Sequence, residues 1–117
     1  MQIREEKDGD RLTLFLQGHL DTVTAPAFES RILTLIDEGA ERILVDCSDV
    51  EYVNSAGLKS FLLAAKRLDA KGGKFVLCGL RPNVMMIFET IGFDRIMTIS
   101  PTREEANRLM DGEATAA

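Results

Sequence analysis

The chain of 117 residues has few of the residues that mark secreted, zinc-binding or membrane proteins. Its two cysteines, Cys47 and Cys78, lack the C-x-x-C spacing of a zinc site and are too few for a disulfide scaffold. Each lies at the end of an apolar run, so we expect buried, reduced thiols. No apolar run approaches the roughly 20 residues of a membrane helix, and residues 1–11 lack the apolar core of a signal peptide. We therefore expect a cytoplasmic protein.

The charge balance argues against nucleic-acid and lipid partners. The sequence has 14 basic and 19 acidic side chains, for a formal net charge of -5. No run of lysines and arginines creates a local exception. Because phosphate backbones and anionic headgroups would be repelled, we expect neither nucleic acid nor a membrane as a partner.

Catalytic and metal-binding patterns are also scarce. The sequence lacks a phosphate-binding loop of the G-x-x-x-x-G-K-[ST] type, a G-x-G-x-x-G motif and a nucleophile elbow. His19 is the single histidine and is expected to be a solvated loop residue. We therefore expect no enzyme activity, no cofactor and no metal. Four acidic residues could still gather at the carboxyl ends of strands, namely Asp21, Asp46, Asp49 and Glu51. Such residues more often cap turns than bind a metal ion, so turn capping is the favoured interpretation.

Short apolar runs indicate the strands of one compact domain, since 45% of the residues are hydrophobic. The continuous runs 43–45 and 75–77 are typical of strands covered on both faces of a mostly parallel sheet. Alternation over residues 11–17 predicts a strand that Gly18 ends. An Asp8-Gly9-Asp10 turn would pair it with an edge strand over residues 1–6.

Amphipathic stretches between these runs predict helices over residues 25–38, 56–70, 82–91 and 103–110. Thr24 and Thr102 are the expected N-caps of the first and last of these helices. With a last strand over 95–99, the order is β-β-α-β-α-β-α-β-α, an open α/β fold with a mostly parallel or mixed sheet. The residues after Met110, 111–117, have too little apolar content to order themselves and are expected to form a disordered tail.

The stretch 44–58, LVDCSDVEYVNSAGL, joins a buried-strand pattern to a serine at the expected start of a helix. The first N–H groups of a helix have no intrahelical partner, and the helix dipole is positive there. Such a position favours a capping hydroxyl and tolerates an added phosphate. Ser55 is therefore either a plain N-cap or a site of modification.

Four motifs in order resemble those of the STAS domain, specifically the bacterial anti-sigma-factor antagonists, over residues 1–110. They are G-x-L-D at 18–21, D-x-S-x-V-x-x-V-N-S-A-G-L at 46–58, K-G-G at 71–73 and G-F at 92–93. The resemblance implies one STAS domain over residues 1–110, as a monomer or weak dimer. It also implies a protein that binds an anti-sigma factor with a histidine-kinase-like ATPase fold, and that is released when this partner phosphorylates it.

In this resemblance the phospho-acceptor position falls on Ser55. Phosphate adds roughly -1.5 to -2 charges, which a helix start can hold but a docked partner would have to desolvate. The residues that the resemblance and the loop pattern place at the partner surface are Asp21, Thr22, Asn54, Ser55, Ala56, Gly57 and Lys59. The docking face would consist of the helix over 56–68 and a loop over 49–55.

One position departs from the family pattern. Many of these antagonists have Asp before the acceptor serine, whereas this chain has Asn54, which carries no charge and cannot act as a base. This keeps a second function open, that of a non-phosphorylated STAS interaction subunit of a lipid-transport ATPase or a stress-signalling assembly. The adjacent Met85 and Met86 cannot be buried equally in one helix, and an exposed one would suit partner docking, although simple core packing is the favoured interpretation.

Overall fold

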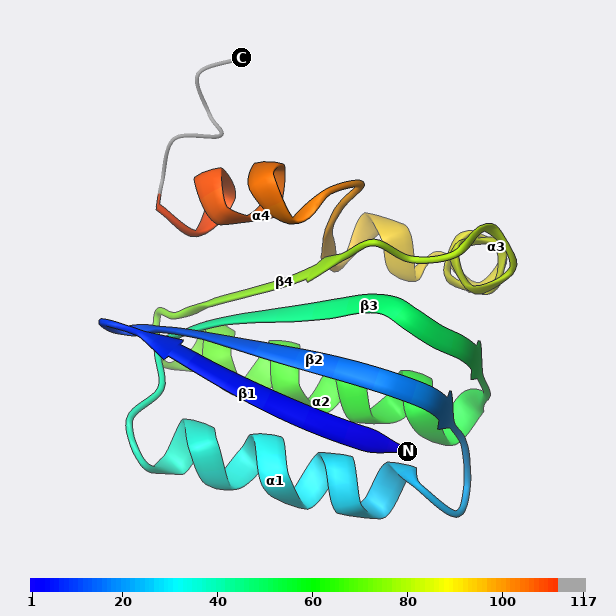
Figure 1. Ribbon diagram of the computed structural model, residues 1–117, viewed down its shortest axis with the longest axis horizontal. Helices are drawn as coiled ribbons and strands as arrows, with labels where there is room; N and C mark the ends of the chain where they lie inside the picture. Colours follow the sequence, from blue (N-terminus) through cyan, green and yellow to red (C-terminus); the bar gives the residue numbers. More distant parts are fainter. Residues whose placement is uncertain (112–117) are drawn as a thin grey trace.

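The computed structural model describes residues 1–111, which form an α/β domain with the predicted order of elements (Figure 1). A 3-10 turn, η1, follows the third helix. The predicted disordered tail lies outside the described residues apart from Asp111, whose carboxylate accepts a hydrogen bond from Arg11 at 2.9 Å. The elements are β1 (Gln2–Asp8), β2 (Arg11–Leu20), α1 (Ala25–Asp37), β3 (Arg42–Val53), α2 (Ser55–Ala70), β4 (Lys74–Cys78), α3 (Pro82–Ile91), η1 (Phe93–Arg95), β5 (Thr98–Ser100) and α4 (Arg103–Met110).

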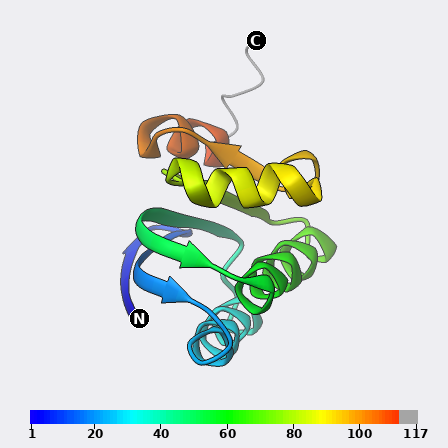
Figure 2. The ribbon, with the colours of Figure 1, turned by 90° about the vertical axis from the view of Figure 1, so that its right-hand side faces the viewer.

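The sheet has the strand order β1-β2-β3-β4-β5. β1 and β2 form the predicted antiparallel hairpin, whose turn contains Gly9 at φ 64°, a value that favours glycine. β2, β3, β4 and β5 are parallel, so helices connect β2 to β3, β3 to β4 and β4 to β5. α1 and α2 cover one face of the sheet and α4 covers the other (Figure 1), while Figure 2 shows α3 beside α2 at one end of the domain.

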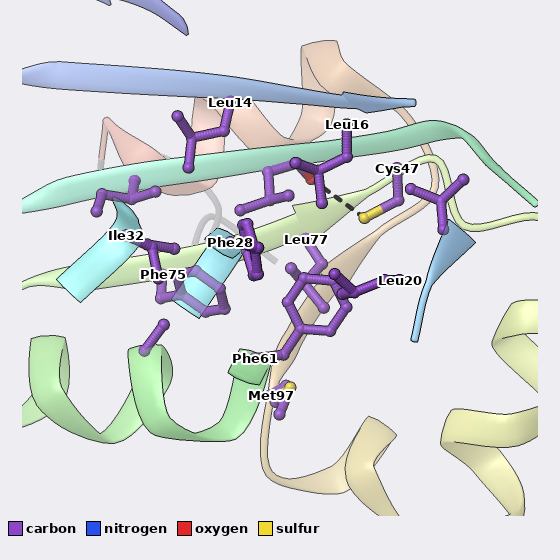
Figure 3. Close-up of a cluster of buried hydrophobic side chains, with 14 of the residues drawn as sticks. Leu14, Leu16, Leu20, Phe28, Ile32, Cys47, Phe61, Phe75, Leu77 and Met97 are labelled. Atoms are coloured by element: carbon purple, nitrogen blue, oxygen red, sulfur yellow. Dashed lines mark hydrogen bonds between the residues drawn. The ribbon is translucent and has the colours of Figure 1, made fainter. Parts of the chain in front are cut away.

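The central strands are buried on both faces, as predicted. Leu44 and Val76 pack with Ala106 and Met110 of α4. The other face holds the larger core, to which α1, α2 and α3 contribute. Figure 3 shows Phe28 of α1 and Phe61 of α2 among its side chains. Three aromatic rings lie in series across these helices, with ring centroids 5.5 Å apart for Phe28 and Phe61 and 6.0 Å apart for Phe61 and Phe88. These contacts fix the position of α2 on the sheet.

Two strands are longer than the sequence predicted. β2 does not end at Gly18, which has φ 111° and lies at an irregularity in the register with β3. β3 continues from the apolar run to Val53, so most of the predicted loop over 49–55 is strand. Alternation fails as a guide here because two register shifts break the period of two. His19 accordingly lies exposed on a strand and not in a loop.

The last strand was predicted over 95–99 and is observed over Thr98–Ser100. Gly92 ends α3 with φ 80° and starts the 3-10 turn, in which the N–H groups of Arg95 and Ile96 donate to the carbonyls of Gly92 and Phe93. These bonds hold the first predicted strand residues in a turn. The apolar residues in this stretch, Ile96 and Ile99, suit a strand and give no sign of a 3-10 turn before it.

The expected state of the two cysteines is confirmed, whereas the core packing favoured for both adjacent methionines is wrong for Met86. Cys47 and Cys78 are free and buried. Burial raises the pKa of both thiols, that of Cys78 to about 12. Met86 is 63% exposed on α3, whereas Met85 is half-buried.

Candidate functional site

The ends of two neighbouring parallel strands position the start of α2. Leu20 of β2 and Val53 of β3 are register partners, and both are buried. The N–H group of Asn54 donates to the carbonyl oxygen of Leu20 at 3.1 Å, which extends the pairing by one residue. The chain therefore enters α2 from a rigid sheet edge, and the first turn of the helix is held in one place.

Asn54, and not Ser55, is the N-cap of α2. Its backbone is extended, with φ -107° and ψ -171°, and its side-chain Oδ1 accepts from the N–H groups of Ala56 at 3.0 Å and Gly57 at 3.3 Å. The capping role that the sequence allowed for Ser55 is therefore wrong. Serine and asparagine are both good caps, so residue type alone could not separate two adjacent candidates.

Ser55 is the first residue of the helix, and its side chain is exposed. The hydrogen bonds of the described residues use the N–H groups of Ala56, Gly57 and Leu58 but not that of Ser55. The hydroxyl group thus lies at the positive end of a helix of 16 residues, where a negative charge is favourable.

Gly57 allows the first turn of α2 to lie directly on the sheet. A Cβ atom at this position would lie 2.6 Å from the carbonyl oxygen of Leu20 and 2.9 Å from Cγ1 of Val53. Real side chains do not tolerate such distances without a backbone shift. Gly57 is buried, so its role is close packing beneath the predicted partner surface rather than contact with a partner.

The loop between β2 and α1 forms the second part of the site. Oδ1 of Asp21 accepts from the N–H groups of Val23 at 2.9 Å and Thr24 at 3.1 Å. The hydrogen bond from the Thr24 N–H, followed by those from Val23 and from the Thr24 hydroxyl, holds the pKa of Asp21 below its ordinary value. Thr24 is at the N-cap position of α1 as predicted, but its side chain makes no capping bond and binds Asp21 and His19 instead.

A hydrogen bond between two side chains joins the β2–α1 loop to the start of α2. Nδ2 of Asn54 donates to Oγ1 of Thr22 at 3.2 Å, and both residues were predicted for the partner surface. Asp21 is one residue away from this bond, whereas Lys59 lies one helical turn beyond Ser55 on the exposed side of α2. The structure thus brings Thr22, Asn54 and Ser55 together and adds Lys59 to the same end of the helix.

Three of the four acidic residues that could have formed a cluster serve different local structures, and the fourth, Asp49, is exposed on β3. Asp21 holds the β2–α1 loop, and Asp46 accepts from the N–H and hydroxyl groups of Ser48. Glu51 lies 3.4 Å from Nε2 of His19. Among residues 1–111, no group of three or more potential ligands is arranged to hold a metal ion. No helix in this part of the chain is long and apolar enough to cross a bilayer.

The sequence did not reveal an apolar surface beside Ser55. Tyr52, Leu58, Ile87 and Ile91 line an open groove between α2 and α3 together with both Asn54 and Ser55. Val23, which follows Thr22, is 86% exposed. A helical wheel of α2 places Leu58 and Leu62 on the apolar stripe that faces the core, and Leu58 is indeed buried. Only the tertiary structure places α3 opposite them.

The fold and this surface define a small α/β domain that presents a hydroxyl group and an amide at the start of an exposed helix, an arrangement suited to protein binding. The chain belongs to the STAS domain family, whose family model matches residues 2–106. The resemblance found in the sequence is thereby confirmed.

Relatives with related functions cover nearly the whole chain. BtrV of Bordetella bronchiseptica, provisionally named an anti-sigma factor antagonist, is 35% identical over 106 residues, covering 91% of each chain. The anti-sigma-B factor antagonist of Listeria monocytogenes is 31% identical over 104 residues, covering 88% of this chain and 90% of the relative. These relatives are named as regulatory proteins.

Solved structures share the fold. A Thermotoga maritima protein, provisionally described as an anti-sigma factor antagonist, has a TM-score of 0.89 at 24% identity, with 93% of this chain and 94% of that chain covered. The Bacillus cell-fate determinant SpoIIAA in its phosphorylated form has a TM-score of 0.73 at 22% identity, with coverage of 92% and 99%. The predicted α/β class and order of elements are those of this fold.

Proposed function

We propose that this protein is an anti-sigma-factor antagonist that binds an anti-sigma factor with a histidine-kinase-like ATPase fold while Ser55 is unphosphorylated. Phosphorylation of Ser55 by that partner releases it. The observation that carries the proposal is the exposed hydroxyl of Ser55 at the first position of α2, beside the linked side chains of Asn54 and Thr22. The names of the relatives support the same partner class.

The residues that hold the helix start in place are not the residue that would be phosphorylated. Asn54 caps the helix and Gly57 packs it on the sheet, so a phosphate on Ser55 would displace neither group. The helix dipole and the uncommitted N–H group of Ser55 would stabilise the phosphate within the domain. A partner seated on the same surface would have to desolvate roughly two negative charges, and release follows from electrostatics without refolding.

The proposed docking face comprises the exposed side of the helix start and the adjoining loop. Asp21 and Thr22 shape the loop, Asn54 and Ser55 lie at the helix start, and Lys59 extends the face by one turn. Ala56 is half-buried at its margin.

The proposal is tested by incubating the protein with ATP and the histidine-kinase-like anti-sigma factor of the same genome, followed by intact-mass measurement. Wild type should gain one phosphoryl group and Ser55→Ala none. Ser30→Ala is the matched control because Ser30 is also an exposed serine on a helix. A wild-type protein that binds the partner but gains no phosphate would refute the switch.

Asn54 favours one alternative function. Without a carboxylate before the serine, the chain could bind its partner constitutively, as a STAS subunit of a lipid-transport ATPase or a stress-signalling assembly. Asn54→Asp separates the two functions, because it should accelerate phosphorylation if the charge assists the kinase. In a constitutive subunit neither Asn54→Asp nor the wild type would be modified.

A further inference from the structure

An apolar groove runs along the exposed side of α2, from Ser55 toward the β5 edge of the sheet. Its first half has a volume of about 510 Å³ and is lined by Leu58, Ile87 and Ile91 among others. Its second half, of about 560 Å³, is lined by Ala65, Ile96 and Met97 among others. Leu62 lines both halves, so the two hollows adjoin at this residue, and together they are named here the α2 groove.

The α2 groove is apolar and open to solvent. Ile91, which lines the first half, is 47% exposed, and Ile96, which lines the second half, is 62% exposed. Ile91 is the last residue of α3, and Ile96 lies in the segment that connects α3 to β5. Exposed aliphatic side chains that flank a groove are typical of a surface that another protein covers.

The charges that line the groove are mainly positive, although the chain as a whole carries -5. Lys59 lines the first half and Lys66 the second, and within residues 1–111 neither forms an ion pair. Lys74 also lines the second half, but its ammonium group donates to the carbonyl oxygen of Leu109 at 3.2 Å. Asp69, at the far end, is the single acidic lining residue found among residues 1–111.

We propose that the α2 groove binds an amphipathic helix of the partner that carries apolar residues along one face and two acidic residues about seven positions apart. Lys59 and Lys66 are themselves seven residues apart, or roughly 10 Å along the helix. The inference takes its partner from the proposed function, but the chemistry of the ligand follows from the groove. Lys66 and the second half of the groove add a contact that lies away from Ser55.

The dimensions of the groove favour a helix over an extended segment. From Ser55 to Asp69 the axis of α2 spans roughly 21 Å, enough for about 14 residues of a helix lying alongside it. An added strand would need a free strand edge, and β5 offers only Thr98–Ser100, beside one half of the groove. Only a helix uses both halves.

The two lysines should respond differently to phosphorylation. Lys59 lies one turn from Ser55, whereas Lys66 is three turns away, or roughly 16 Å, which exceeds the Debye length of about 8 Å at physiological salt. A phosphate would therefore disturb binding at the first half and leave the second half unchanged. The groove then supplies partner recognition that is independent of the switch.

The test uses the full chain and a synthetic helical peptide of about 16 residues with leucines on one face and two glutamates seven positions apart. A second peptide carries lysines in place of the glutamates. Binding is measured by fluorescence anisotropy and mapped by amide chemical shifts. Glutamate peptide should bind wild type, with shifts along α2 and α3, and should bind the Lys59→Glu/Lys66→Glu variant about tenfold or more weakly. Lysine peptide should show the reverse preference.

Lys7→Glu is the matched control for a single substitution such as Lys66→Glu, because it makes the same charge change on the exposed β1 strand, at the opposite edge of the sheet from β5. It should leave peptide binding unchanged. Equal affinity for the two peptides, or shifts confined to β5, would overturn the proposal, the latter in favour of strand addition. So would an affinity for the anti-sigma factor that falls equally in Lys66→Glu and Lys7→Glu.

These outcomes are independent of the phosphorylation assay. If the glutamate peptide binds but Ser55 gains no phosphate, the groove stands and the switch is refuted. If Ser55 is phosphorylated and the peptide does not distinguish wild type from Lys59→Glu/Lys66→Glu, the switch stands and the groove proposal is wrong.

Discussion

Replacing Asn54 should change the stability of the domain in a direction that depends on the replacement. Asn54→Ala removes the acceptor for the N–H groups of Ala56 and Gly57. Loss of an N-cap costs about 1 kcal/mol of unfolding free energy, within a range of about 0.5–2. With an m-value of about 2 kcal/mol/M, the urea midpoint should fall by about 0.5 M.

Asn54→Asp should have the opposite effect at neutral pH. The carboxylate keeps the acceptor, and the hydroxyl of Thr22 can turn from accepting to donating. A negative charge at the start of α2 should add about 0.3–1 kcal/mol. Because the helix start would lower the folded pKa of this aspartate, the gain should be present above the unfolded value of about 3.9 and disappear as the pH falls through the folded one.

The assay is urea unfolding of wild type, Asn54→Ala and Asn54→Asp at pH 7 and pH 3, with Thr22→Ala as the control for the bond between the loops. The reasoning is refuted if Asn54→Ala is no less stable than Thr22→Ala, since the cap would then contribute nothing. It is equally refuted if Asn54→Asp keeps its full advantage at pH 3.

Four further predictions concern the same corner and the core. Gly57→Ala should lose about 1–3 kcal/mol because its Cβ would overlap Leu20, although glycine-to-alanine in an exposed helix usually gains about 1; thermal or urea unfolding decides the sign. Ser55→Ala should change stability by less than about 0.5 kcal/mol in the same assay, since a drop of about 1 would make Ser55 the cap after all. Cys47 and Cys78 should not react with a thiol reagent in the native protein, and both should react after unfolding, because the raised pKa keeps each thiol protonated. The stability advantage of wild type over Asp21→Asn should shrink as the pH falls through the lowered pKa of Asp21, and a pH-independent difference would contradict that assignment.

The elements whose ends are marked by particular residues were predictable from the sequence. The helices over 82–91 and 103–110 were predicted with their observed bounds, since Pro82 and Thr102 mark their starts and Gly92 marks one end. The helix predicted over 25–38 differs by one residue. The continuous apolar runs also gave the correct two-faced burial of the central strands.

The missed features depend on contacts between distant segments. β3 reaches Val53 only because β2 runs beside it, past a glycine that sequence alone would take as a stop. Once β3 ends at Val53, Asn54 becomes the cap and Ser55 the first helical residue. The groove was equally hidden, because its two walls come from elements separated by β4 in the chain.

The position of Ser55 illustrates why a modifiable residue needs neighbours that hold the structure. Asn54 satisfies the N–H groups of the first turn, and Gly57 sets the distance between α2 and the sheet. Asp21 fixes the adjoining loop through its own hydrogen bonds. Since the described residues give the Ser55 side chain none of these tasks, a change in its charge alters what can bind the surface without changing the fold that presents it. If a serine were the N-cap instead, its phosphorylation would also remove the hydrogen bonds that hold the first turn of the helix. Modification would then change the structure of the helix start as well as its charge.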